Sequence, residues 1–355
     1  MPLIDRGRTA LSAAHATLRE HAPLIGVVAA YFLAAVLVAR INGLPYRFAP
    51  NLGGYALALF IPLVFAFCWH ALSVMLFVRP ARLTLYLLKS LKPYLAPQRL
   101  MFAAPVLLLI PVFASTFTFF KSAIPALNPY AWDGLFTRWD ALLHGGSHPW
   151  VLLQPLLGYP IVTGSINFLY NLWFFVMYAL LTLQAFDTRN PSLRMRFLLS
   201  FVLSWIVLGT LGAIAFSSMG PCYDPAIIRN DGPYASLMNY LREANEQVPV
   251  WALNVQQMLW ENYQNNRAGM GSGISAMPSM HVATATLMAL FGWQHSRMAG
   301  MALTLYALAV FIGSVHLAWH YALDGYAGIA GAWLVWWLVG RWQQGTGPRT
   351  TRTAT

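Results

Sequence analysis

The chain has 355 residues, of which 58% are hydrophobic and 9% are charged. A soluble globular domain carries roughly 25% charged residues, so this composition excludes an ordinary water-soluble fold. The formal net charge is +11. Of the two cysteines, Cys68 lies in an apolar run and Cys222 in a polar segment, so we expect neither a disulfide nor a zinc site between them.

Apolar runs along the chain predict an all-α polytopic membrane bundle of about eight transmembrane helices. About 20 apolar residues cross the hydrocarbon core of a bilayer as a helix. The first 22 residues are polar and mixed and carry no signal-peptide cleavage pattern, so the first span is expected to be retained. The predicted spans lie near 23–40, 53–78, 101–120, 161–185, 197–217, 279–296, 299–318 and 321–341.

The basic residues predict the orientation of these spans. With a cytoplasmic N-terminus, the inner segments carry 15 of the 22 Lys and Arg residues and three of the 11 acids. This asymmetry predicts both termini inside. The net charge then reflects topology and attraction to anionic headgroups, and it does not indicate nucleic acid binding.

Two outer segments are long. Within 121–160, apolar residues at helical spacing predict an amphipathic helix in the membrane interface near 131–145. The segment 218–278 is a long loop that ends in a Gly-rich stretch, 269–273, and loops of that size are functional or disordered.

Pro278-Ser279-Met280-His281 is the first motif that can carry chemistry. A proline suits the first turn of a helix, and the free N–H groups there attract phosphate. His281 could then donate a proton to a leaving oxygen. The alternative is an ordinary helix start with an interfacial histidine.

His316, His320 and Asp324 form the second motif. The spacings i, i+4 and i+8 predict three polar groups near one helical face, and ionisable residues inside membranes usually mark function. His320 and Asp324 suggest a nucleophile and its orienting carboxylate. A metal site made by all three, and a polar face bonded between helices, are the alternatives.

The predicted topology brings the two motifs together. His281 falls at the outer end of the sixth span, and His320 falls in the outer turn between the seventh and eighth spans. Neither histidine entered the count of basic residues, so this agreement is independent of the orientation.

At this point the residues resemble a known family. Pro278-Ser279-Met280-His281 looks like the PSxH motif, and His320-Tyr321-Ala322-Leu323-Asp324 like the HYxxD motif, of the type 2 phosphatidic acid phosphatase (PAP2) superfamily. The resemblance covers about residues 130–350. It implies a PAP2-like six-helix core, with residues 1–120 as an N-terminal part and 121–355 as the catalytic domain. It also implies a catalytic trio in which His320 attacks phosphorus, Asp324 supports it and His281 protonates the leaving group.

The sequence departs from the phosphatase branch of that family. The KxxxxxxRP motif is absent, because position 72 is Leu ahead of Arg79-Pro80. The Ser-Arg pair before the second His is replaced by Gly313 and Ser314. These absences, together with Arg138-Trp139-Asp140, look like the branch that contains inositol phosphorylceramide synthase.

A transferred phosphoryl group needs cations, and Arg138 and Arg267 are the favoured ones among the outer basic residues. Tyr170 and Asn171 lie on the outer half of the fourth span, where they could line a cavity or bond between helices. Gly325, Gly328 and Gly331 predict a close helix-packing face. The full set of expected substrate-binding residues is Ser279, Arg138, Arg267, Tyr170, Asn171, Tyr321 and His316.

The sequence therefore predicts an integral membrane lipid phosphotransferase that uses no metal or other cofactor. Its expected partners are a phospholipid donor, a lipid or sugar alcohol acceptor and the bilayer. Its expected place is a bacterial inner membrane, with the active site facing the periplasm or exterior. The alternatives are a lipid phosphate or polyprenyl diphosphate phosphatase, a metal or solute transporter, and a non-catalytic scaffold.

Overall fold

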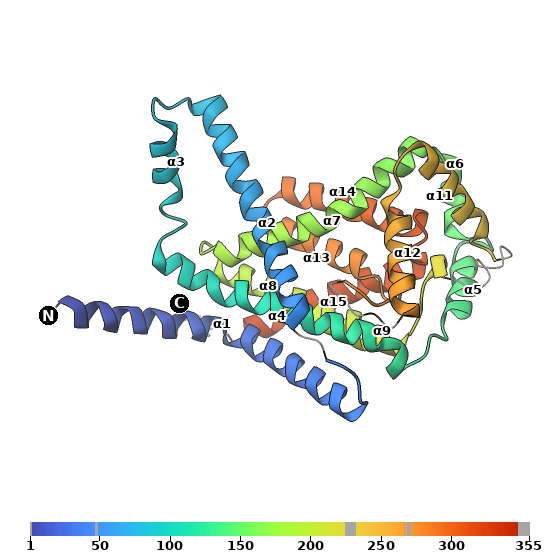
Figure 1. The fold of residues 1–355 in the computed structure, drawn as a ribbon, viewed down its shortest axis with the longest axis horizontal. Helices are drawn as coiled ribbons and strands as arrows, with labels where there is room; N and C mark the ends of the chain where they lie inside the picture. The colour runs from blue at the N-terminus through green and yellow to red at the C-terminus, as the bar shows by residue number, and fades with distance from the viewer. Residues whose placement is uncertain (1, 47–48, 224–231, 266, 268–270, 347–355) are drawn as a thin grey trace, which may run out of the picture.

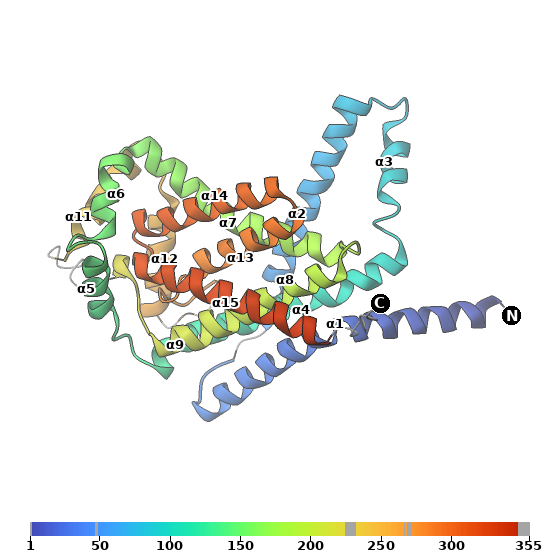
Figure 2. The same ribbon diagram turned by 180° about the vertical axis from the view of Figure 1, so that it is seen from behind.

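The computed structural model describes residues 2–46, 49–223, 232–265, 267 and 271–346. Within these residues every regular element is a helix, which confirms the all-α prediction (Figures 1 and 2). In chain order the elements are α1 (Pro2–Ile41), α2 (Ala49–Ser73), η1 (Val74–Val78), α3 (Leu83–Leu91), α4 (Pro97–Leu127), α5 (Asp133–Leu143), α6 (Pro149–Leu157), α7 (Pro160–Phe186), α8 (Pro191–Ile206), η2 (Val207–Gly212), α9 (Ala213–Ala215), η3 (Pro221–Tyr223), α11 (Ala235–Gln247), α12 (Trp251–Gln264), α13 (Met280–His295), α14 (Arg297–His316) and α15 (Ala322–Thr346).

Seven helical segments of the described chain are long and apolar enough to cross a membrane, which suggests an integral membrane protein. The sixth predicted span, 279–296, corresponds to α13, which has only 16 residues but packs among α8, α14 and α15. The seven segments are Ser12–Ile41, Leu52–Val78, Pro97–Leu127, Pro160–Phe186, Pro191–Ala215, Arg297–His316 and Ala322–Gly345.

The long helices run side by side in one bundle. α13 lies between α14 and α15, and α7, α8 and α4 close the other side (Figures 1 and 2). α1 packs on α4 and α8, whereas α2 packs on α4 and α7. α1 begins and α15 ends at the same end of the bundle, and α5, α6, α11 and α12 gather at the opposite end (Figure 1).

The first helix is longer than the predicted span 23–40, because α1 extends back to Pro2. The preceding residues are rich in Ala and Leu, which are strong helix formers. Their side chains also find partners, since Thr17 and His21 are buried and the Arg194 guanidinium of α8 donates a hydrogen bond to His21 Nε2 at 2.8 Å. Favourable contacts with α8 thus extend the helix beyond the apolar run.

The segment 218–278 was expected to be a loop, but its described residues include two helices, α11 and α12. α11 buries one apolar face, formed by residues such as Leu237, Met238 and Leu241. α12 is tied to the bundle, because Ala252 N–H donates to Asn167 Oδ1 at 3.1 Å. The apolar residues of this segment are too few to mark a helix by themselves. They are buried because α11 packs against α7 and α12 packs near the turn after α14.

The prediction that His316, His320 and Asp324 share one helical face is wrong. α14 ends at His316, and Ala318 adopts a left-handed conformation with φ of 59° before α15 begins at Ala322. A non-glycine residue seldom takes this conformation, so the sequence gives little sign of the break. The turn directs His316 away from the other two residues.

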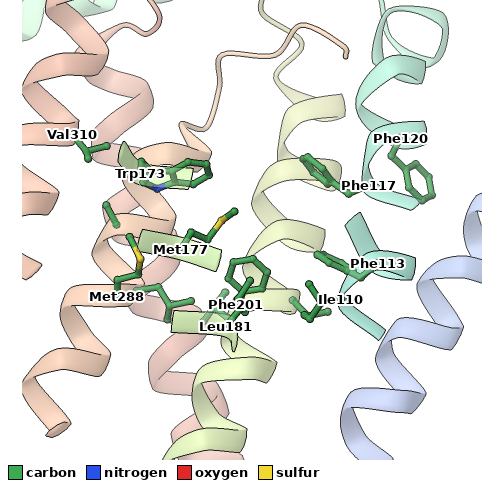
Figure 3. Packing of buried hydrophobic residues seen from close by; sticks show 14 of the residues in the cluster. Ile110, Phe113, Phe117, Phe120, Trp173, Met177, Leu181, Phe201, Met288 and Val310 are labelled. Atoms are coloured by element: carbon green, nitrogen blue, oxygen red, sulfur yellow. The ribbon is translucent and has the colours of Figure 1, made fainter. Parts of the chain in front are cut away.

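The core is a cluster of large apolar side chains between α4, α7 and α8. Figure 3 shows Ile110, Phe113 and Phe117 of α4 pointing towards Phe201 of α8 and the side chains of α7. Phe113 and Phe201 are almost fully buried, and their ring centroids lie 6.4 Å apart. These rings form the floor beneath the site described next.

Candidate active site

His320 and Asp324 form a pair at the turn between α14 and α15. His320 Nδ1 lies 3.3 Å from Asp324 Oδ2, and the Tyr321 backbone N–H donates to the same oxygen at 3.0 Å. Asp324 is fully buried, so its carboxylate is held in one place. A carboxylate that accepts from Nδ1–H fixes the tautomer and leaves Nε2 with the lone pair. His320 is therefore arranged to react through Nε2.

His281 faces His320 from the start of α13. The ring centroids of the two histidines are 6.2 Å apart. The His281 ring stacks on Tyr170, at 4.6 Å and 18°, and lies 4.3 Å from the ring of Trp173. Two aromatic side chains of α7 thus hold this imidazole in position. The contribution of Trp173 was not foreseen, because its position in an apolar span is typical of an ordinary core residue.

Backbone contacts lock the two motifs together. Ser279 N–H donates to the Asp324 carbonyl oxygen at 3.0 Å, and Ser279 Oγ accepts from Val282 N–H at 3.4 Å. A Cβ on Gly328 would lie 2.7 Å from the Ser279 carbonyl oxygen, so only glycine permits this approach of α13 and α15. Ser279 is fully buried, and it caps α13 instead of facing the cavity.

The expected packing role of Gly325, Gly328 and Gly331 is also visible in their surroundings. A Cβ on Gly325 would meet Phe311 at 2.3 Å, and one on Gly331 would meet Leu208 at 2.5 Å. Each glycine therefore lets α15 approach a different neighbour.

Two aspartates of α5 support the turn between α14 and α15. Asp140 accepts hydrogen bonds from the backbone N–H groups of Ala322 and Leu323, at 3.2 and 3.0 Å, so it caps the start of α15. Burial raises the pKa of the Asp140 carboxyl, and the two backbone bonds oppose that shift. Asp133 accepts from Tyr321 O–H at 3.1 Å and also binds the segment 218–220. One sign of these roles was present in the sequence, since the chain has only 11 acidic residues and each acid is therefore a candidate for a specific contact.

A cavity of about 500 Å³ opens in front of the two histidines. Its polar end is formed by His281, His320 and Lys121, and the rest of its wall is largely apolar. The Gly-rich segment closes one side, where Gly273 takes φ of +92° and a Cβ would lie 2.7 Å from the Lys121 carbonyl oxygen. The cavity has the size and mixed lining of a small-ligand site.

Lys121 is the cation that faces this cavity, which corrects the choice of Arg138 and Arg267. The latter two side chains are exposed, and Arg138 Nε donates to its own helix at Gly134 O. Within the described residues, no hydrogen bond or ion pair engages the Lys121 ammonium. The direction of the Lys121 side chain depends on the packing of α4, which the sequence alone does not give.

The remaining expected site residues divide into two groups. Tyr170 and Asn171 line the cavity. Tyr321 is fully buried behind the pair and bonds to Asp133, and His316 Nε2 lies 2.9 Å from Thr163 Oγ1. These last two residues act as supports of the turn and of the α7–α14 contact, not as parts of the cavity wall.

The described part of the chain contains no group of three His, Cys, Asp or Glu side chains placed to hold a metal ion. The metal alternative depended on His316, which is engaged with Thr163. Both cysteines are free, Cys68 on the exposed side of α2 and Cys222 half-buried near the turn.

Comparison with known proteins agrees with this geometry. The model of the PAP2 superfamily matches residues 135–338, more than half of the chain, and this range contains both histidines and Asp324. No curated protein and no solved structure matches the chain. The match indicates an activity of the phosphatase or phosphotransferase type on lipid phosphates. With its paired histidines facing one cavity, the chain belongs to the PAP2 superfamily.

Proposed function

We propose that this protein is an integral membrane phosphotransferase that moves a phosphate-linked headgroup from a phospholipid to an alcohol through a phosphohistidine on His320. The observation that carries the proposal is the arrangement at the cavity head. His281 and His320 face each other there, and Asp324 bonds to the far side of His320.

In the first step, His320 Nε2 attacks phosphorus and forms a P–N bond. The bond from phosphorus to the lipid alcohol breaks, and His281 gives its proton to the departing oxygen. Asp324 stabilises the positive charge that develops on His320, because its carboxylate accepts from Nδ1–H.

In the second step, an acceptor alcohol gives its proton to His281 and attacks phosphorus. The P–N bond breaks, His320 regains its lone pair, and a new phosphoester forms. Both histidines return to their starting state, so the cycle is balanced. Water as the acceptor would make the same site a phosphatase.

Lys121 and the start of α13 supply the charge complement for the phosphate. The first N–H groups of a helix have no partner within it, and they attract anions. Met280 and His281 occupy these positions at the cavity wall. Together with one ammonium they can stabilise the oxygens of the transition state without a metal ion.

The charge at the site favours a transferase over a phosphatase. Among the described residues that line the cavity, Lys121 is the one Lys or Arg. A phosphate monoester carries about −1.5 to −2 charges near neutral pH, whereas a phosphodiester carries a single one. One lysine matches a diester donor, in keeping with the resemblance to inositol phosphorylceramide synthase. The acceptor is then a lipid or sugar alcohol.

The site is proposed to face the outer leaflet, with both termini in the cytoplasm of a bacterial inner membrane. The support is that the active-site turn lies near α5 and α12, at the end opposite the start of α1 and the end of α15 (Figure 1). The excess of basic residues at that other end fits the cytoplasmic side.

Product analysis tests the proposal. Purified protein is incubated separately with phosphoinositide, phosphatidate and polyprenyl phosphate donors, with a lipid alcohol present, and the lipids are identified by mass spectrometry. A new phosphodiester lipid is expected. Free phosphate as the sole product would identify a phosphatase, and no turnover of any donor would overturn the enzyme assignment.

A further inference from the structure

The cavity continues from its polar head into an apolar channel. On α4 its lining extends from Lys121 to Ile110, and on α7 from Tyr170 to Leu181. At about 1.5 Å per helical residue, each path is about 16 Å long. This is about half of the roughly 30 Å hydrocarbon core, which is the depth of one leaflet.

Polarity changes along this channel. Lys121, Asn171 and the two histidines lie at its head, whereas Phe113, Phe117, Met177 and Phe201 lie below them. Figure 3 shows the rings of Phe113 and Phe117 directed from α4 towards the side chains of α7 and α8. A gradient of this kind suits an amphiphile with a phosphate head and an apolar chain, and it does not suit a polar solute.

α2 forms the wall between the channel and the surrounding lipid. Tyr55, Ala58, Ile61 and Pro62 line the channel. In the apolar stretch of α2, only 6% of the residues are buried, so its other faces are open to the bilayer.

Two sets of hydrogen bonds hold this wall in place. Tyr55 O–H is bonded to Thr118 of α4 and accepts from Gly271 N–H at 3.1 Å. Thr182 of α7 donates to the Leu59 carbonyl oxygen at 3.0 Å. α2 is therefore attached to its neighbours at Tyr55 and again one helical turn further along, at Leu59.

We propose that this channel binds one apolar chain of the lipid substrate, and that α2 and α4 determine which chains the enzyme accepts. The proposal rests on the lipid phosphoester chemistry proposed above and adds a substrate class. The substrate is a membrane amphiphile whose phosphate meets Lys121 and whose acyl or isoprenoid chain reaches about one leaflet deep. Both helices lie outside the family match at 135–338, so this specificity belongs to the N-terminal part of the chain.

The expected effect of the channel is on selectivity more than on affinity. A lipid chain leaves a bilayer that is as apolar as the channel, so transfer between the two contributes little free energy. The shape of the channel therefore determines which chain lengths are accepted, because a channel filled by a larger side chain can no longer hold a long chain. Short-chain substrates should therefore be insensitive to changes in the channel.

Ala58→Trp is the variant that fills the channel, and Ala56→Trp is its matched control. Ala56 lies on the same helix but is exposed and does not line the channel. The measured quantity is kcat/KM for a long-chain phosphoester divided by that for its short-chain, water-soluble homologue. We expect at least about a tenfold fall in this ratio for Ala58→Trp and an unchanged ratio for Ala56→Trp. Equal losses on both substrates in Ala58→Trp would overturn the proposal.

Cross-linking tests the channel without turnover. The inactive His320→Ala variant is incubated with a phosphatidate, and in a second arm with a polyprenyl phosphate, each with a photoreactive group at the chain end. Label is expected on the floor residues Ile110, Phe113 and Phe201, and the arm that labels them identifies the chain. Label confined to lipid-facing side chains such as Phe65 or Leu108 would refute chain binding. Floor labelling without turnover by the unaltered protein would sink the proposed reaction and leave the chain site standing.

Discussion

Asp324→Asn isolates the electrostatic contribution of the buried carboxylate. The asparagine has nearly the same shape, and its carbonyl oxygen can still accept from Tyr321 N–H and from His320 Nδ1–H. The bond from Ser279 N–H to the Asp324 backbone oxygen is unaffected, so α13 and α15 keep their contact. The substitution therefore removes a negative charge while retaining the local structure.

The distance in the pair gives the size of the effect. Two unit charges 3.3 Å apart interact by about 5 kcal/mol at an effective dielectric constant of about 20. This interaction is present only when His320 becomes cationic, during attack on phosphorus. At about 1.4 kcal/mol per factor of ten, the loss corresponds to a fall in kcat of about 10³- to 10⁴-fold.

The assay is steady-state transfer of a labelled headgroup, with kcat and KM measured separately and folding monitored by thermal unfolding. KM should change little, because Asp324 is buried behind His320 and does not line the cavity. Retention of kcat within about tenfold would refute the proposed stabilisation of the histidine cation.

Three further predictions follow from the site and its packing. Lys121→Gln should lower kcat/KM about 10²-fold or more, because it removes the one Lys or Arg among the described cavity residues, and Lys121→Arg should retain part of the activity. Full activity of the Gln variant would exclude a contact between Lys121 and the phosphate. Gly328→Ala should destabilise the fold by about 1–3 kcal/mol, because its Cβ would press on the Ser279 carbonyl oxygen, whereas Gly26→Ala, with open space around it, should be neutral or stabilising in the same unfolding measurement. Excess EDTA should leave the transfer rate unchanged, and a loss that Mg²⁺ or Zn²⁺ restores would contradict the metal-free mechanism.

Much of the fold could be predicted because a bilayer imposes a simple rule on sequence. Each long apolar run had to form a helix that satisfies its own backbone, and these runs correspond to helices of the structure. α1 is longer than predicted and α12 lies in a predicted loop, and both differences have a physical reason. Their ends and faces are stabilised by residues distant in sequence, such as Arg194 for α1 and Asn167 for α12.

The candidate site was predictable where a motif fixes the local geometry, or where the predicted spans bring two motifs to the same end of the bundle. His320 and Asp324 lie four residues apart, so their contact requires one turn of chain. Lys121, Trp173 and Asp133 reach the site from other elements, and their directions depend on how α4, α5 and α7 pack. The prediction for His316 was wrong because its spacing suggested a place on the same helical face as His320 and Asp324. The left-handed turn at Ala318 ends that helix and separates His316 from the other two residues.

Trapping the covalent intermediate tests the central claim most directly. The protein is mixed with a donor radiolabelled at phosphorus in the absence of acceptor, quenched in alkali and digested. The label should be stable in base, labile in acid and located on His320, and it should be absent from His320→Ala. Label on another residue, or undiminished transfer by His320→Ala, would contradict the account.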